Sequence, residues 1–302
     1  MSTITRKKVN KQKVKPVKIK VEERPIKGAE ICPTLYFNML EVAQTNVGKT
    51  TVTAHVLDQI IGEETIQVIA FVSSLYNDPI WGKIEEDVLD KDVDFVGHLS
   101  IKEEGQNLLK DYLLDFTEEA KAKRENKDKE EPEEHVDLMA VLAKENGLSH
   151  YLSKAANQIV RVDSNKPKKE KLPKFASPKY VFIFDDLGDE LKTPSYSSLT
   201  KKSRHFDICT ITAIQDLKDI RPSVLTQMRV VLLFGRQAED RIYHAWYLLK
   251  PPMPFDLFFQ LYKDATTPEP DDPKPFFYVN VRDNLFGRNF DSKYFIPAKF
   301  LN

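Results

Sequence analysis

A loop with one glycine, set between an apolar segment and an amphipathic segment, restricts the fold of this chain more than any other feature. Residues 35–42 read LYFNMLEV and predict a short buried strand. Residues 50–61 carry apolar side chains at spacings of three and four, which is typical of a helix. Between them, residues 43–50 read AQTNVGKT, the spacing of a phosphate-binding loop (P-loop) with alanine at the first glycine position. Strand, P-loop and helix in this order indicate an α/β domain.

The residues of the P-loop have distinct tasks in binding phosphate. Successive backbone N–H groups wrap the phosphate oxygens, and the helix N-terminus faces them. Gly48 permits close approach of the backbone, Lys49 is expected to reach the β- and γ-phosphates, and the Thr50 hydroxyl is expected to bind Mg²⁺. Alanine at position 43 is tolerable if its φ is negative. The alternative is an ordinary strand–turn–helix junction. The predicted nucleotide-binding residues are Ala43, Gln44, Thr45, Asn46, Val47, Gly48, Lys49, Thr50 and Thr51.

A P-loop predicts a second element, an apolar strand that ends in an acidic residue. Residues 180–184, YVFIF, supply the strand, and Asp185 and Asp186 follow it directly. Asp185 is the expected Mg²⁺ partner, and Asp186 is expected to orient and deprotonate the attacking water. The alternative is that both acids only cap the helix that follows.

Polar residues near two further strands complete the predicted site. Gln215 ends the apolar strand at 207–214, where its side chain would sense the γ-phosphate or orient water. An arginine from a neighbouring subunit can stabilise the charge that builds up in phosphoryl transfer. Arg204 is the first candidate, followed by Arg229 and Arg236 beside the strand VVLLF. Gln215 as a loop residue, and surface ion pairs for the arginines, are the alternatives.

Strands alternate with helices along the rest of the chain, which predicts a mainly parallel sheet flanked by helices. The remaining predicted strands are 66–72 and 230–234, and the segment 276–281 predicts an edge hairpin. The remaining predicted helices are 102–116, 135–156, 189–203, 239–249 and 254–262.

Charge divides the chain into a core and polar segments. Residues 1–28 contain ten Lys or Arg and two Glu, and they indicate a solvated tail, an arm that touches nucleic acid, or a nuclear localisation signal. Residues 118–134 hold 13 charged residues out of 17, which predicts an exposed helical extension or a disordered insertion. The predicted division is a basic arm at 1–30, a P-loop domain at 31–265 with insertions at about 117–135 and 163–177, and an aromatic extension at 266–302 that packs on the core.

Composition excludes several classes of protein. A hydrophobic fraction of 41% over 302 residues excludes a wholly disordered chain. No apolar run approaches the roughly 18–20 residues that span a bilayer, and the basic N-terminus lacks the apolar region of a secretory signal. Cys32 and Cys209 cannot build a disulfide framework or a zinc site, so we expect a reducing compartment.

The motifs taken together resemble the FtsK–HerA superfamily of DNA-pumping ATPases. The motifs, in chain order, are AQTNVGKT, FIFDD, SRHFDICTITAIQ and QMRVVLLF. More narrowly, they are similar to the poxvirus-type genome-packaging ATPases of large DNA viruses, virophages and Polinton-like elements. NDPIW at 77–81 and FFYVNVRDNLFGRNFD at 276–291 fit this narrower group. The resemblance covers roughly residues 34–290.

The resemblance implies a P-loop NTPase fold of the ASCE/RecA-like type that hydrolyses ATP with Mg²⁺. It also implies a ring of five or six subunits with ATP at their interfaces, double-stranded DNA as partner, and contact with capsid proteins at a portal vertex. Arg204 and Arg229 match family arginines, and the strand of Gln215 is expected beside that of Asp185. The implied location is the virion or an intracellular virus factory.

The sequence departs from the family pattern at two positions, and it is compatible with two other functions. Ala43 replaces a glycine, and Asp186 stands where many relatives carry the longer glutamate. Another P-loop motor, such as a helicase or AAA-type remodeller, would share the chemistry but not the substrate. A non-catalytic nucleotide- or DNA-binding module would bind without hydrolysis.

Overall fold

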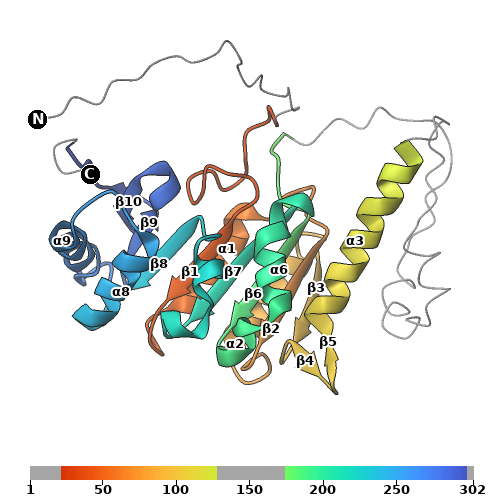
Figure 1. The fold of residues 1–302 in the computed structure, drawn as a ribbon, viewed down its shortest axis with the longest axis horizontal. Helices are drawn as coiled ribbons and strands as arrows, with labels where there is room; N and C mark the ends of the chain where they lie inside the picture. The colour runs from red at the N-terminus through yellow and green to blue at the C-terminus, as the bar shows by residue number, and fades with distance from the viewer. Residues whose placement is uncertain (1–21, 128–173, 298–302) are drawn as a thin grey trace, which may run out of the picture.

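Most of the chain folds around one sheet. The computed structural model describes residues 22–127 and 174–297. Within these residues the sheet has nine strands in the order β11-β10-β9-β8-β1-β7-β6-β2-β3 (Figure 1). The strands are β1 (Asn38–Val42), β2 (Gln67–Val72), β3 (Asp94–His98), β6 (Tyr180–Asp185), β7 (Ile208–Ile214), β8 (Val230–Phe234), β9 (Phe276–Asn280), β10 (Leu285–Arg288) and β11 (Ser292–Lys293). All pairs from β8 to β3 are parallel, whereas β9, β10 and β11 pair antiparallel.

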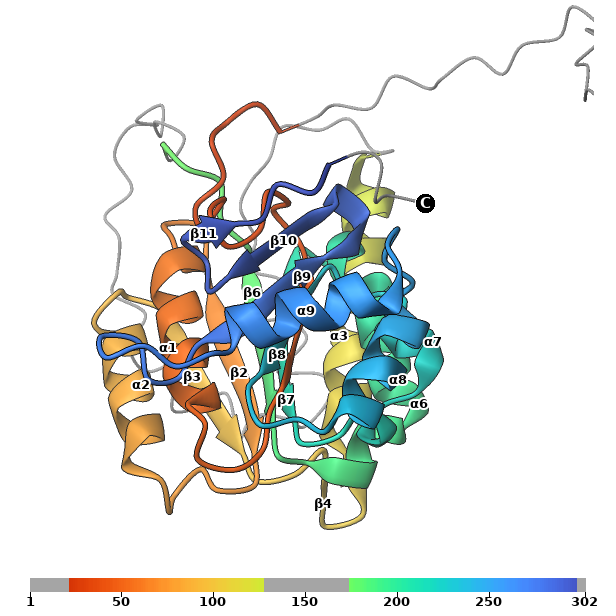
Figure 2. The same ribbon diagram turned by 90° about the vertical axis from the view of Figure 1, so that its left-hand side faces the viewer.

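Helices cover both faces of the sheet (Figure 2). One face packs against α1 (Lys49–Ile60) and α2 (Pro79–Leu89). The other face packs against α3 (Leu108–Lys127), α6 (Pro194–Lys202), α7 (Pro222–Leu225), α8 (Glu239–Leu249) and α9 (Phe255–Ala265). Every residue of β1, β7 and β8 is buried, as expected for strands covered on both sides. The predicted α/β class, with a mainly parallel sheet flanked by helices, is confirmed.

The order of the central strands decides where a site can form. β7 lies between β1 and β6, and β8 lies on the other side of β1. The strand of Gln215 is therefore adjacent to the strand of Asp185, as predicted. Because these strands are parallel, the loops that follow them meet at one edge of the sheet. We call this the carboxyl edge, and the opposite side the amino edge.

The predicted helix at 102–116 is wrong at its start. Residues 102–107 instead form a small hairpin of β4 (Lys102–Glu103) and β5 (Gln106–Asn107). Glu104 and Gly105 both have positive φ, 50° and 83°, which is the backbone of a tight hairpin turn and is incompatible with a helix. α3 then begins at Leu108 and runs to Lys127, so residues 118–127 continue it as a helical extension.

The predicted helix at 189–203 is interrupted. Residues Gly188–Lys192 form a 3₁₀ turn, and α6 starts only at Pro194. A proline lacks the N–H that an α-helix interior needs but is accommodated in the first turn of a helix, so the break falls at this residue. The predicted strand at 35–42 begins three residues late, at Asn38.

Neither α2 nor β3 was predicted from the sequence. α2 starts behind Asp78, whose carboxylate accepts a hydrogen bond from the Ile80 N–H, and Pro79 occupies its first position. β3 pairs parallel with β2 and forms one end of the sheet. The predicted hairpin near residues 276–281 is present as β9 and β10, joined by the turn Val281–Asp283.

Several sequence-based predictions fall outside the described residues. They include the helix at 135–156 and most of the basic arm and of the second insertion, and the division into domains stays a prediction. In the described part of the chain, no helix has the length and apolar character needed to cross a membrane.

Candidate nucleotide-binding site

The P-loop leaves β1 and enters α1 with its backbone amides available. Gly48 is the N-cap of α1 and has φ 99°, and Asn46 has φ 64°. No side chain caps the helix, and its first turn carries no acidic residue. The N–H groups of that turn therefore have no side-chain acceptor at the cap, the arrangement in which a helix N-terminus binds an anion.

Alanine at position 43 fits its place in the loop. Ala43 is fully buried, and it is not among the described residues with positive φ. Its N–H donates to the carbonyl of Ile214, at 3.0 Å. The glycine expected at this position is therefore not required by the backbone.

Lys49 lies over the loop. Its Nζ donates to the Ala43 carbonyl at 3.4 Å, so the ammonium is held beside the loop amides. Thr50 is partly buried and Thr51 is exposed in the first turn of α1. On the outside, Gln44 Nε2 donates to the Arg236 carbonyl at 3.3 Å, which ties the P-loop to the end of β8.

Asp185 is a buried carboxylate with spare hydrogen-bonding capacity. It ends β6 with 7% of its surface exposed, and its Oδ1 has no hydrogen-bond partner in the described part of the chain. Burial raises its pKa to about 6; the positive charge of Lys49 lowers that pKa, and the charges of Asp186 and Asp78 raise it. A cation bound at Oδ1 would favour the ionised form in the same way as Lys49.

Asp186 and Gln215 form a pair at the carboxyl edge. Asp186 has φ 56°, which turns the chain sharply after β6 and leaves the side chain exposed. Gln215 Nε2 donates to Asp186 Oδ1 at 2.7 Å. The two polar residues predicted at the ends of adjacent strands therefore meet.

A cleft of about 660 Å³ opens where the P-loop faces this pair. Its lining is Gln44, Thr45, Asp186, Gly188, Gln215, Asp216, Asp219 and Arg241. Arg241 comes from α8 and was not predicted. Its Nη2 lies 3.5 Å from Asp216 Oδ2, and 44% of its side chain is exposed. Arg241 belongs to no recognisable motif, because it is simply a basic residue near the start of a predicted helix. Only the packing of α8 beside the cleft shows that it lines the site.

The predicted arginines lie on different sides of the molecule. Arg229 immediately precedes β8, and its guanidinium pairs with Asp283 at 2.6 and 3.0 Å. Arg204 precedes β7, in the turn Ser203–His205, and is exposed. Both therefore lie at the amino edge, away from the cleft of their own chain. Arg236 follows β8 and lies at the carboxyl edge beside the P-loop.

Glu41 is a buried acid that sequence reasoning missed. It lies in β1 with no exposed surface; its Oε1 accepts from Thr53 Oγ1 at 3.3 Å, and Oε2 has no partner within the described residues. Both Glu41 and Asp185 pair in register with Ala213 of β7. Burial raises the pKa of Glu41 well above its usual value, and the charge of Asp185 adds to the rise. Its one sequence signal was a charge inside a strand whose other residues, apart from Asn38, are apolar.

The side chains present fit a magnesium ion. Asp185 offers a buried oxygen without a partner, and Thr50 lies on the first turn of the helix that follows the P-loop. Over the described ranges, no group of three or more His, Cys, Asp or Glu side chains could hold a metal ion. Mg²⁺ takes few protein ligands and completes its shell with water and phosphate oxygens, so Thr50 and Asp185 suffice for it.

Comparison with known proteins finds similar solved structures but no matching family or sequence. No protein-family profile and no curated protein sequence matches the chain. Among solved structures it is similar to the genome packaging NTPase B204 from Sulfolobus turreted icosahedral virus 2 in complex with ATP-gammaS. The identity is 13% and the TM-score 0.42, over 85% of this chain and 98% of that chain. B204, the DNA-packaging ATPase from Sulfolobus turreted icosahedral virus, matches at 12% identity and a TM-score of 0.43, over 84% and 96%.

Proposed function

We propose that this chain hydrolyses ATP with Mg²⁺ and uses the reaction to move double-stranded DNA into a preformed viral capsid. The meeting of the P-loop, Asp185 and the Asp186–Gln215 pair at one edge of the sheet carries the ATPase part of the proposal. The motif set that resembles genome-packaging ATPases supports the DNA part, with the virion or a virus factory as location.

The residues of the site divide the chemistry among themselves. The amides of residues 44–49 and the Lys49 ammonium hold the β- and γ-phosphates, and Thr50 and Asp185 hold the metal. Mg²⁺, when bound, neutralises charge on the phosphate oxygens. Asp186, oriented by Gln215, accepts a proton from a water molecule while the oxygen of that water attacks the γ-phosphorus. The bond to the β–γ bridging oxygen breaks, and ADP and phosphate leave.

The amino edge carries the two arginines that could act on the nucleotide site of a neighbouring subunit. Arg229 is already paired with Asp283. Within the described ranges, Arg204 is exposed and makes neither a hydrogen bond nor an ion pair. This difference favours Arg204 as the residue that reaches the cleft of the next subunit in a ring of five or six. The basic segments at 1–28 and 166–174 are the proposed DNA contacts.

ATPase rates with and without linear duplex DNA test the proposal. We expect the wild type to hydrolyse ATP and duplex DNA to stimulate it. Lys49→Ala and Asp185→Asn should each lose about 10²–10³-fold in rate, because each removes stabilisation of the transferring phosphoryl group. Lys83→Ala, on the exposed side of α2, is the matched control and should keep the wild-type rate.

Each result separates the alternatives. A wild type without hydrolysis in any oligomeric state would leave a non-catalytic binding module. Hydrolysis that only forked or single-stranded DNA stimulates would favour a helicase. Hydrolysis indifferent to every DNA would contradict the translocase.

A further inference from the structure

A lysine from the C-terminal part of the chain packs on the P-loop. A Cβ added to Gly48 would lie 3.3 Å from Cδ and 3.8 Å from Cβ of Lys274. Gly48 and Lys274 are therefore in contact although most of the domain separates them in sequence. Figure 2 shows the segment between α9 and β9 reaching across to α1, which begins at the P-loop.

The backbone around Lys274 is restrained on both sides. Pro273 and Pro275 flank the lysine, and each fixes its own φ and restricts the residue before it. Two residues upstream, Asp272 and Glu269 exchange backbone hydrogen bonds of 3.0 Å. Two residues downstream, the N–H of Phe276 donates to the side chain of Asn289 at 3.1 Å.

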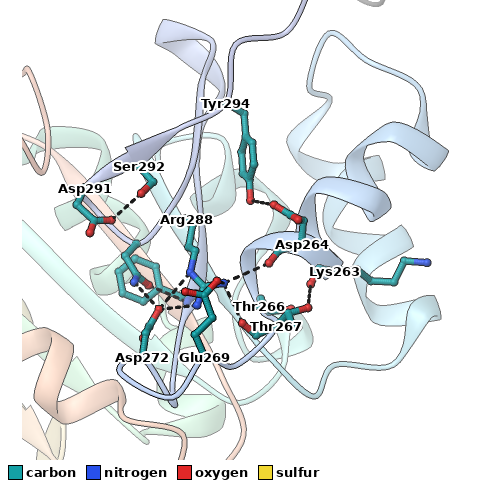
Figure 3. A network of polar contacts seen from close by, with 12 residues as sticks. Lys263, Asp264, Thr266, Thr267, Glu269, Asp272, Arg288, Asp291, Ser292 and Tyr294 are labelled. Atoms are coloured by element: carbon teal, nitrogen blue, oxygen red, sulfur yellow. Dashed lines mark hydrogen bonds and ion pairs between the residues drawn. The ribbon is translucent and has the colours of Figure 1, made fainter.

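The guanidinium of Arg288, on β10, binds this segment through several polar contacts (Figure 3). Its Nε and Nη2 donate to Asp272 Oδ2 at 3.1 and 2.8 Å, and its Nη1 lies 3.2 Å from Glu269 Oε1. Nη1 also donates to the Thr267 carbonyl at 2.8 Å. Only 14% of the Arg288 side chain is exposed, whereas its partners Asp272 and Glu269 are 29% and 58% exposed. The guanidinium thus joins three points of the segment that presents Lys274.

Among the described residues, the ammonium of Lys274 has no counter-charge. In the part of the chain that the structure describes, Lys274 is exposed and makes no hydrogen bond or ion pair. Its stem lies 3.3 Å from the place that a side-chain Cβ would take on Gly48, the residue just before Lys49. Lys49 and Lys274 therefore bring two positively charged side chains to one P-loop, and an anion with several charges would relieve the repulsion between them. A polyphosphate chain is such an anion.

From this geometry we infer that Lys274 is a second cation of the nucleotide site and binds the polyphosphate of a nucleoside triphosphate across Gly48. The inference rests on the proposed function, because it takes the P-loop as a nucleotide site. Lys274 would contact bound substrate, whereas Arg288 acts through the segment it braces and is a positioning residue. The nucleotide would then contact both the P-loop, near the start of the domain, and Lys274, near its end.

Binding constants for nucleotides with different numbers of phosphates test this role. We expect Lys274→Ala to raise the Kd for ATP about tenfold, the loss of one charge-assisted hydrogen bond. The Kd for ADP should rise less, and the Kd for AMP should stay unchanged. Lys274→Arg should keep ATP affinity within about threefold, because the charge is retained. Lys293→Ala, an exposed lysine on β11, is the control and should bind like the wild type.

The test separates this inference from the proposed function. If Lys49→Ala binds ATP as tightly as the wild type, the P-loop is not a nucleotide site and both fail. If Lys49→Ala weakens ATP binding and Lys274→Ala does not, only the role of Lys274 is overturned. An equal effect of Lys274→Ala on ATP and AMP would also overturn it, because the phosphates would not be what the lysine senses.

A double mutant tests the positioning role of Arg288. Arg288→Gln should weaken ATP binding in the wild-type background and have little further effect in Lys274→Ala. Thermal unfolding of each variant shows whether the fold persists, and Asp272→Asn breaks the same brace from the other partner. If Arg288→Gln and Asp272→Asn weaken binding equally in both backgrounds, the brace does not act through Lys274.

Discussion

Three carboxyl groups at the ends of β1 and β6, the strands on either side of β7, have different environments. Glu41 of β1 is fully buried, Asp185 at the end of β6 is 7% exposed, and Asp186, the next residue, is exposed. The chain turns between the last two because Asp186 adopts a positive φ. A difference of one residue therefore separates an acid with a buried free oxygen from an acid that reaches solvent and Gln215.

Glu41 should make the stability of the protein depend on pH. Its folded-state pKa is raised, so the folded protein binds the proton more tightly than the unfolded chain does. Stability is then greatest below the unfolded pKa, near 4.5, and falls as the pH rises toward the folded pKa. Glu41→Gln cannot ionise and should be more stable than the wild type at pH 8, by about 1–3 kcal/mol.

Urea unfolding at pH 5 and pH 8 measures this effect. The gap between Glu41→Gln and wild type should widen toward pH 8. Glu86→Gln, an exposed acid on α2, serves as the control and should follow the wild type. The same pH slope for Glu41→Gln and the wild type would rule out an ionisable buried Glu41.

Asp186 should affect turnover more than substrate binding. Its Oδ1 accepts from Gln215 and faces the cleft, where an attacking water would lose its proton. Asp186→Asn keeps the size of the side chain but loses the basic oxygen, so we expect kcat to fall about 10²–10⁴-fold with KM within about threefold. Steady-state kinetics measure both constants. A KM that rises while kcat is unchanged would assign Asp186 to binding.

At the scale of elements, replacing a turn glycine and replacing a helix glycine with alanine should change the stability of the fold in opposite directions. Gly105 has φ 83° in the β4–β5 turn, whereas Gly82 lies in α2 with no atom near the place a Cβ would take. Gly105→Ala should cost about 1 kcal/mol, because alanine disfavours positive φ. Gly82→Ala should stabilise by about 0.5–1 kcal/mol through helix propensity. Denaturant unfolding measures the change in unfolding free energy for each variant. If both variants are stabilised, or both destabilised, the backbone conformation assigned to one of the two glycines is wrong.

Elements with strong local signals are the ones that sequence patterns predicted well. β6, β7, β8 and α8 follow apolar runs or helical spacing and lie close to their predicted positions. The hairpin β4–β5 and the break before α6 were missed because a turn of two residues and one proline outweigh helical spacing. β3 was missed because an edge strand with one glycine and two charged or polar ends has little apolar signal.

At the scale of the whole molecule, the two edges of the sheet separate the parts of the proposed site. The P-loop and its acids lie at the carboxyl edge, whereas Arg204 and Arg229 lie at the amino edge. One chain cannot bring Arg204 to its own cleft, so any contribution of this arginine to catalysis requires a second copy of the chain. That requirement makes assembly and activity inseparable in the proposed motor.

Mixing two inactive variants tests this requirement. Lys49→Ala should lack hydrolysis because its own site is damaged, and Arg204→Ala should lack it because the neighbour's site is incomplete. In mixed assemblies some interfaces pair an intact P-loop with an intact Arg204, so ATPase activity should return. Mixing Lys49→Ala with Asp185→Asn is the control, because both damage the same site. No recovery in the first mixture would show that Arg204 does not act between subunits.

The sequence alone determined the features that depend on neighbours along the chain. The P-loop spacing, the acid after an apolar strand and the helical and strand periods all act over a few residues, and so they can be read locally. The tertiary structure decided everything that depends on which segments meet. It encloses Glu41 in register with Asp185, turns Arg241 into the cleft, and lays Lys274 on Gly48. These contacts follow from strand order and helix packing, and no local pattern in the chain encodes them.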